Sequence, residues 1–316
     1  MNSMMRIFGA AVLLSSIVAA CGQPQREDVG APIGGPGDDA LLARPEVDAI
    51  NGGEGIDVVD YSRSDAGVIV RLWKGTGENG YAQGDTYSQI ENANGSPLAD
   101  SLVGADNISN RLDGGAGDDS LSGLSGDDTI VGGPGADRID GGAGSDTADY
   151  SGSDAGVIVR VWNGTGEGGD AQGDRLTNVE NVTGSGFADS LIGADGVENR
   201  LDGNAGNDSL FGLSGDDTLN GGLGADRLNG GAGADIFVLK AGEANGDVVI
   251  DFASDGPGRG DVLSFVGYGT VEAGATITRV NSTHWRVSSA DGQTVDTITI
   301  ANGASLNSND YRFVDG

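Results

Sequence analysis

Aspartates that recur every nine residues are the side chains of this sequence best suited to chemistry. From Gly114 the chain reads GGAGDDSLS, GLSGDDTIV, GGPGADRID and GGAGSDTAD, and from Gly203 it reads GNAGNDSLF, GLSGDDTLN, GGLGADRLN and GGAGADIFV. Each unit has the form G-G-x-G-x-D-x-U-x, in which U is apolar. Calcium prefers hard oxygen ligands and takes six to eight of them. One short turn cannot supply that number, so we expect stacked turns to share each ion.

The glycines and the apolar residue predict the elements that position these aspartates. Glycine at positions 1, 2 and 4 permits turn conformations that bring backbone carbonyls close to an ion. Positions 7 to 9 predict a short strand whose position 8 points inward, at Leu121, Ile130, Ile139, Leu210, Leu219, Leu228 and Phe237. If each unit makes half a turn of a coil, units two apart stack, which pairs Asp119 with Asp137, Asp128 with Asp146, Asp208 with Asp226, and Asp217 with Asp235.

The repeats belong to a duplicated module with weaker copies around it. The sequence at Asp113 recurs 89 residues later at Asp202, and the same shift carries Val68-Ile69-Val70-Arg71 onto Val157-Ile158-Val159-Arg160. Degenerate units precede both sets, such as GGPGDDALL, ARPEVDAIN and GGEGIDVVD from Gly34. Even where glycines are lost, position 6 keeps a side-chain oxygen, at Asp39, Asp48, Asp57, Asp100, Asn110, Asp189 and Asn199.

The composition also calls for a bound cation. The 316 residues include 59 glycines and 48 acidic against 17 basic residues, which gives a formal net charge of -31. Glycine loses much backbone entropy on folding, and the acidic excess repels itself in a compact state unless cations neutralise it. Nucleic acid is excluded as a partner because the sequence has no cluster of Lys and Arg. A disordered tract would lack the apolar residue at every ninth position.

These units resemble the repeats-in-toxin (RTX, hemolysin-type) family of secreted calcium-binding proteins. The resemblance implies an all-β fold, a parallel β-roll solenoid of nonapeptide repeats in duplicated modules with a C-terminal β cap. It implies several Ca²⁺ ions between adjacent turns, bound by the position-6 aspartates Asp39, Asp57, Asp119, Asp128, Asp137, Asp146, Asp208, Asp217, Asp226 and Asp235. Asp48, Asp100, Asp189, Asp247 and Asp251 are further candidate ligands. Asp85 and Asp174 are equally compatible with binding calcium and with simple solvation.

The sequence predicts eight segments. They are a signal peptide at 1–20, a tether at 21–33, degenerate repeats at 34–60, connecting strands at 61–94, a first β-roll at 95–149, connecting strands at 150–183, a second β-roll at 184–238, and a capping, secretion-like β region at 239–316. The connecting strands, with their alternating apolar residues, are expected to extend the roll through longer rungs.

The two ends of the chain carry conflicting export signals. Residues 1–20 resemble an export signal whose apolar stretch, Ile7 to Ala20, is too short to span a membrane as a helix, and Val18-Ala19-Ala20-Cys21 resembles the lipobox of bacterial lipoproteins. Lipid on Cys21, the only cysteine, predicts an anchor on the outer surface of a Gram-negative bacterium. The last strands resemble the recognition region of type I secretion substrates, which leaves a fully secreted protein as the alternative. Otherwise we expect no contact with a membrane.

We expect calcium-dependent folding without catalysis, because no catalytic constellation is visible. His284 is the only histidine, so a two-histidine zinc motif is impossible, and no G-x-S-x-G motif occurs. A surface or secreted structural or adhesive protein is the first hypothesis, and an accessory part of a toxin or secreted-enzyme system is the alternative. If Trp73, Trp162 and Trp285 cluster on one exposed face, a cell-surface carbohydrate or a protein becomes the expected ligand; if they are scattered or buried, a structural role is favoured.

Overall fold

Short strands alternate between two sheets along the chain, with a turn at each crossing. The computed structural model describes residues 32–254 and 260–315, which lie in one unit, Ala31–Gly316. The predicted signal peptide, Cys21 and most of the tether lie outside the described residues. No helix in the described part is both long enough and apolar enough to cross a membrane.

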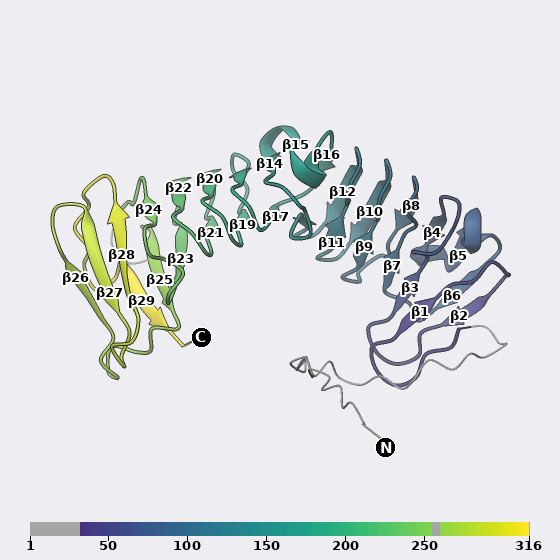
Figure 1. Ribbon diagram of the computed structural model, residues 1–316, viewed down its shortest axis with the longest axis horizontal. Helices are drawn as coiled ribbons and strands as arrows, with labels where there is room; N and C mark the ends of the chain where they lie inside the picture. The colour runs from purple at the N-terminus through teal and green to yellow at the C-terminus, as the bar shows by residue number, and fades with distance from the viewer. Residues whose placement is uncertain (1–31, 255–259, 316) are drawn as a thin grey trace, which may run out of the picture. The chain divides into compact units, whose positions relative to one another are not determined.

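The first sheet, here called the long sheet, contains twelve strands that are all parallel to their neighbours. It runs through the unit without a break, so the segments predicted as separate rolls share one continuous stack (Figure 1). Its strands in spatial order are β1 (Ala40–Leu42), β3 (Val58–Asp60), β7 (Asn92–Asn94), β9 (Arg111–Asp113), β11 (Thr129–Val131), β13 (Thr147–Asp149), β17 (Asn181–Thr183), β19 (Arg200–Asp202), β21 (Thr218–Asn220), β23 (Ile236–Lys240), β25 (Val262–Val266) and β29 (Tyr311–Val314).

The second sheet, here called the interrupted sheet, is parallel except at three antiparallel units. Its strands in order of pairing are β2 (Ala49–Asn51), β6 (Thr86–Ser88), β5 (Thr76–Glu78), β4 (Ile69–Arg71), β8 (Ser101–Val103), β10 (Ser120–Ser125), β12 (Arg138–Ala143), β16 (Arg175–Thr177), β15 (Thr165–Glu167), β14 (Ile158–Arg160), β18 (Ser190–Ile192), β20 (Ser209–Ser214), β22 (Arg227–Ala232), β24 (Val248–Val249), β28 (Val295–Ile300), β27 (His284–Ser288) and β26 (Thr276–Arg279).

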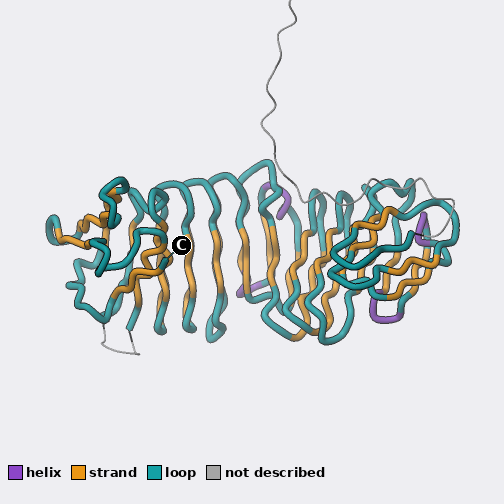
Figure 2. Tube along the Cα trace, turned by 90° about the horizontal axis from the view of Figure 1, so that it is seen from below, coloured by secondary structure: helices purple, strands orange, loops and turns teal. Residues whose placement is uncertain are grey.

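The register confirms that units two apart stack. Leu121 lies opposite Ile139 and Leu210 opposite Leu228 in the interrupted sheet, while Ile130 lies opposite Ala148 in the long sheet. Each unit therefore makes half a turn of the coil. Figure 2 shows the resulting row of strands, with turns on both sides.

The core is a thin double row of apolar side chains. The middle residue of each strand in the repeats points inward, and all seven predicted position-8 residues are buried. Parallel strands stack these side chains directly above one another, as Leu102, Leu121 and Ile139 show across β8, β10 and β12. Core packing therefore links each rung mainly to its two neighbours.

Two equivalent inserts interrupt the second sheet. In the first, β4, β5 and β6 form an antiparallel unit with the 3₁₀-helices η1 (Leu72–Lys74) and η2 (Gly80–Ala82). In the second, β14, β15 and β16 do so with η3 (Val161–Asn163) and η4 (Gly169–Ala171). Each insert extends the stack on both sides, because β6 pairs with β2 and β4 with β8 in the first insert, and β16 pairs with β12 and β14 with β18 in the second.

The C-terminal segment covers the final apolar rung. The antiparallel strands β26, β27 and β28 extend the interrupted sheet beyond β24, and β29 completes the long sheet. Aromatic rings pack where the stack ends, with Phe265 contacting Tyr268, Tyr311 and Phe313 at centroid distances of 5.8, 6.4 and 5.2 Å. This aromatic cluster gives the last strands a structural role.

A pair of leucine substitutions tests the thin core. Leu121 is 1% exposed between two stacked rungs, whereas Leu223 is 54% exposed in a turn. In saturating calcium, Leu121→Ala is expected to lower the free energy of unfolding by about 2–5 kcal/mol because it leaves a cavity. Leu223→Ala is the matched control and is expected to change it by less than about 0.5 kcal/mol. Denaturant unfolding measures both values, and equal effects would contradict this core.

Candidate metal centre

The position-6 aspartates form a ladder of hydrogen bonds along each edge of the stack. One carboxylate oxygen, Oδ1, accepts the backbone N–H of the aspartate 18 residues earlier. Asp119 donates to Asp137 over 2.8 Å, and Asp128 donates to Asp146 over 2.8 Å. The second set repeats this arrangement between Asp208 and Asp226, and between Asp217 and Asp235, at 2.9 Å each. The predicted pairs are therefore in direct contact.

The other carboxylate oxygen, Oδ2, is buried without a hydrogen-bond partner. This holds for Asp48, Asp57, Asp119, Asp128, Asp137, Asp146, Asp208, Asp217, Asp226 and Asp235. A buried polar atom normally finds a partner, and leaving one unpaired costs about 1–3 kcal/mol, or more when the group is charged. Ten orphaned oxygens in one periodic array indicate a missing positive partner.

Backbone oxygens converge with these carboxylates beside the first glycine of each unit. A Cβ added at Gly114 would fall against Asp119 Oδ2 and lie 2.8 Å from the carbonyl oxygen of Gly132, in the turn stacked above. The same cradle recurs at Gly123, between Asp128 Oδ2 and the Gly141 carbonyl. Glycine is required there because any side chain would fill the cradle. The donors are carboxylate and carbonyl oxygens from two turns, which is the donor set that calcium prefers.

Burial sets the electrostatics of the ladder. It raises the pKa of Asp137, Asp208 and Asp235 to about 7, and that of Asp119 to about 6, because the charged form is desolvated. Neighbouring ladder carboxylates add to the shift by repulsion, as Asp174 and Asp119 do for Asp137. A cation among them would remove this penalty.

At the first rung after each insert, a serine donates hydrogen bonds to both oxygens of the ladder aspartate. Asp100 Oδ1 accepts the Ser96 hydroxyl at 2.9 Å, and its Oδ2 accepts the Ser96 backbone N–H. Asp189 makes the same bonds with Ser185, at 2.8 and 2.6 Å. These two candidate ligands are thus already satisfied by protein donors.

Tyrosines play the same part inside the inserts. Asp85 and Asp174 lie in the ladder, because their Oδ1 atoms accept the N–H groups of Asp48 and Asp137 at 2.7 and 2.8 Å. Their Oδ2 atoms accept the buried hydroxyls of Tyr61 and Tyr150, at 2.8 and 2.9 Å. Both aspartates are buried, so simple solvation does not describe them. In these rungs a tyrosine hydroxyl donates to the Oδ2 atom, which has no partner in the regular rungs.

Three further side chains bring their own partners. The guanidinium of Arg44 is 2.7 Å from Asp48 Oδ1, which places a positive charge beside that carboxylate. At Asn110 and Asn199, the side-chain amide donates to the carbonyl oxygens of Glu91 and Glu180. In these two rungs the asparagine amide, rather than an ion, is the hydrogen-bond partner of the backbone carbonyl.

The remaining candidates lie at the two ends of the stack. Asp39 is half-buried in the first turn and accepts the Gly35 N–H at 2.6 Å. Asp247 is buried at the other end and accepts the Asp226 N–H at 3.1 Å, while burial raises its pKa to about 7. Asp251 uses both oxygens to accept the N–H groups of Gly230 and Gly231.

Two ladder members were missed by the sequence reasoning. Glu91 and Glu180 accept the N–H groups of Asp57 and Asp146 at 2.9 Å, where the register would place another aspartate. They lie in three-residue links outside the nonapeptide pattern. Their separation of 89 residues was the available signal.

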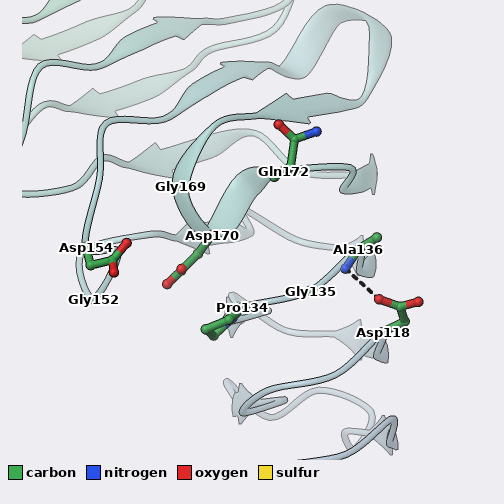
Figure 3. Close-up of a pocket in the computed structure, with 9 residues that line it drawn as sticks. All are labelled: Asp118, Pro134, Gly135, Ala136, Gly152, Asp154, Gly169, Asp170 and Gln172. Carbon is green, nitrogen blue, oxygen red and sulfur yellow. Dashed lines mark hydrogen bonds between the residues drawn. The ribbon is translucent and has the colours of Figure 1, made fainter.

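The described residues contain no group of three or more carboxylate, histidine or cysteine side chains placed to hold a metal. One hollow of about 670 Å³ is lined by Asp118, Asp154 and Asp170 together with residues 134–136, Gly152, Gly169 and Gln172. In Figure 3 Asp154 and Asp170 lie on one side of it, and Asp118 on the other already accepts the Ala136 N–H at 3.0 Å.

Comparison with known proteins supports the repeat assignment. The RTX calcium-binding nonapeptide repeat, in four copies, matches residues 33–60, 110–148 and 199–242. No curated protein matches the chain. Among solved structures, the extracellular lipase LipA from Serratia marcescens is similar at 20% sequence identity and a TM-score of 0.30, over 73% of this chain and 41% of the lipase chain. The chain thus spans less than half the length of that lipase.

Adjacent aspartates in one turn provide a matched test of the ladder. Asp128 is buried with an orphaned Oδ2, whereas Asp127 is exposed and accepts the Ser145 N–H at 2.9 Å. Asp128→Asn is expected to raise the calcium midpoint of folding at least about tenfold, in line with losses seen when metal-site groups are altered. Asp127→Asn removes the same formal charge and is expected to leave the midpoint nearly unchanged. A calcium titration followed by circular dichroism compares them, and equal shifts would mean that net charge alone controls the response.

The raised pKa values predict the response of the calcium-free protein to pH. Unfolded aspartates ionise near pH 4, whereas the buried ladder carboxylates keep their protons up to pH 6–7. Folding is therefore favoured fully below about pH 4, and this contribution is lost as the pH rises to about 7. In chelator, strand content measured by circular dichroism should be higher at pH 5 than at pH 8. A calcium-free protein that folds better at pH 8 would contradict these pKa shifts.

Proposed function

We propose that this chain, which carries RTX calcium-binding nonapeptide repeats, is an extracellular scaffold that folds when calcium fills its turns and that serves a structural or adhesive role. The observation that supports it best is the periodic array of buried, unpartnered Oδ2 atoms. Without a cation these carboxylates oppose folding, and a thin core has little to offset them. With calcium, the binding free energy becomes folding free energy.

The ions are assigned to the rungs in which the aspartate Oδ2 atom has no protein donor. The proposed ligands are Oδ2 atoms of Asp57, Asp119, Asp128, Asp137, Asp146, Asp208, Asp217, Asp226 and Asp235, together with backbone carbonyls of the flanking turns. Asp39 and Asp247 are proposed as ligands at the ends of the stack. Asp48 pairs with Arg44, and Asp100, Asp189 and Asp251 are proposed to position backbone groups instead.

The proposed location is the outside of the cell, where calcium is plentiful. Repeats of this class suggest an extracellular protein, and extracellular calcium modules bind with Kd values of about 10⁻⁴–10⁻³ M. Such sites would fill only outside the cytosol. Lipid on Cys21 is the proposed anchor, and it is supported by the lipobox-like sequence alone. The C-terminal strands are proposed to act as a cap, since β29 pairs with β25 and its aromatic residues close the stack.

We propose no catalytic role for the described residues. The only histidine, His284, is exposed at the start of β27, and its Nδ1 lies 2.9 Å from the Thr283 hydroxyl and 3.1 Å from Asn281 Oδ1. The three aspartates that line the hollow of about 670 Å³ lie in loops and in η4. Most of the buried aspartates are position-6 residues of the repeats, so their burial is assigned to the ladder rather than to a hydrolytic site.

Removal of calcium tests the proposed function. In millimolar calcium at pH 7.5, far-ultraviolet circular dichroism of the full chain should show strand structure. Excess chelator should abolish most of it, and added calcium should restore it, because the ladder carboxylates are ionised and unpaired without the ion. Magnesium is the control cation and is expected to restore little, since it demands octahedral geometry and keeps its waters. An unchanged strand signal in chelator would refute calcium-dependent folding.

A further inference from the structure

A shortened turn beside an exposed tryptophan, here called a notch, recurs in each module. In the repeats, the inward residues of two strands joined by a crossing from the interrupted sheet to the long sheet lie nine or ten positions apart, as Ile50 and Val59 do in β2 and β3, whereas Tyr87 in β6 and Ala93 in β7 lie only six positions apart. The crossing between β6 and β7 takes only three residues, Gln89 to Glu91. Because β7 lies between β3 and β9, this short link is set between two longer turns. The missing length leaves a hollow of about 370 Å³.

An exposed tryptophan forms one wall of this notch. Trp73 is 54% exposed in η1, and its backbone N–H is fixed by the Gly104 carbonyl at 2.9 Å. The lining also includes Gln89, Ile90, Glu91, Asp106 and Ile108. Ile90 is buried and Ile108 is partly exposed, so an apolar floor meets a polar rim.

The polar rim retains acceptors for a ligand. Asp106 Oδ1 accepts the Ser125 hydroxyl at 3.1 Å, and Gln89 donates its amide to the Gly53 carbonyl at 2.6 Å. The described residues give no hydrogen bond to Asp106 Oδ2 or Gln89 Oε1. Both atoms can therefore accept hydrogen bonds from a bound molecule.

The second module builds the same arrangement. The link 178–180 between β16 and β17 also has three residues, and Trp162 is 56% exposed in η3 with its N–H on the Gly193 carbonyl at 3.1 Å. Asp195 accepts the Ser214 hydroxyl at 2.9 Å, as Asp106 does with Ser125. Val179 and Asn178 occupy the places of Ile90 and Gln89. The contacts around both tryptophans are thus equivalent, whereas Trp285 is buried in the C-terminal segment.

We propose that the two notches bind a neutral polysaccharide, one sugar unit at each tryptophan. The C–H face of a pyranose ring packs on an exposed indole, and its hydroxyls donate to carboxylate and amide oxygens of the rim. The net charge of -31 and the rim carboxylates repel anionic ligands, and the pairing of an exposed indole face with hydrogen-bond acceptors matches an uncharged, hydroxyl-rich ligand. A hollow of this volume suits a small ligand unit, whereas a stable protein partner takes about 20–30 residues a side.

The spacing of the notches favours a polymer over a single sugar. Strands β7 and β17 are separated by β9, β11 and β13 in the long sheet, which is four strand intervals. At about 4.8 Å per interval the two short links lie roughly 19 Å apart along the long sheet. One polysaccharide chain with repeating units can occupy both notches, and binding at two linked sites raises the overall affinity above that of either single contact. This inference rests on the proposed function in that calcium must first fold the rungs that form the notches.

Affinity electrophoresis of the full chain in calcium tests the proposal. The probes are four neutral polysaccharides in the gel: dextran, laminarin, hydroxyethylcellulose and mannan. At least one should retard the wild-type protein, each of Trp73→Ala and Trp162→Ala should weaken the retardation at least about tenfold through lost linkage, and the double variant should abolish it. Phe187→Ala removes a 50% exposed aromatic residue outside the notches and should bind like wild type.

The experiment distinguishes failure of the saccharide proposal from failure of the proposed function. Circular dichroism with calcium is recorded for every variant, so a folded wild type that no probe retards overturns the saccharide proposal alone. Retardation that survives in the double variant overturns it as well. Binding of poly-lysine, lost in the double variant and without any polysaccharide binding, would assign the notches to a cationic partner and also overturn it. Tryptophan-dependent retardation in a protein that folds without calcium would instead overturn the proposed function.

Discussion

A buried carboxylate with one satisfied and one unsatisfied oxygen is the feature on which this structure depends. In each full repeat, Oδ1 accepts a backbone N–H of the neighbouring turn, which fixes the stacking of units two apart. Oδ2 remains buried and unpaired beside a glycine cradle. The first bond builds the coil, and the second oxygen makes the coil dependent on a cation. The same aspartate therefore controls both architecture and the response to calcium.

The chain removes this dependence at selected rungs by supplying protein donors. Ser96 and Ser185 satisfy Asp100 and Asp189, and Tyr61 and Tyr150 satisfy Asp85 and Asp174. These rungs flank or form the inserts, where the crossing lengths change and two regular turns no longer face each other. Hydroxyl and backbone N–H donors occupy both oxygens of these carboxylates, so neither oxygen is left unpaired for an ion. The strands thus form one continuous stack, whereas the proposed cation sites are separated into groups by the rungs that have protein donors.

The repeats made much of the fold predictable, and the inserts did not. The nine-residue pattern gave the strands, the inward residues such as Leu121 and Phe237, and the stacking of Asp119 on Asp137, because each follows from a local period. The roles of Glu91 and Glu180 escaped, since they lie in links where the period is broken. Asp85 and Asp174 were left undecided because their tyrosine partners lie 24 residues away. The exposure of Trp73 and Trp162 and the burial of Trp285 required the packing of neighbouring turns.

The account is tested most directly by locating the ions. Crystals grown in calcium, measured at a wavelength where calcium scatters anomalously, give its positions without reference to a protein model. Anomalous peaks are predicted beside Oδ2 of Asp119, Asp128, Asp208 and Asp217, and none is predicted beside Asp85, Asp100, Asp174 or Asp189. Peaks beside the serine- and tyrosine-bound aspartates, or none beside the orphaned oxygens, would contradict the claim that unpaired Oδ2 atoms determine where calcium binds.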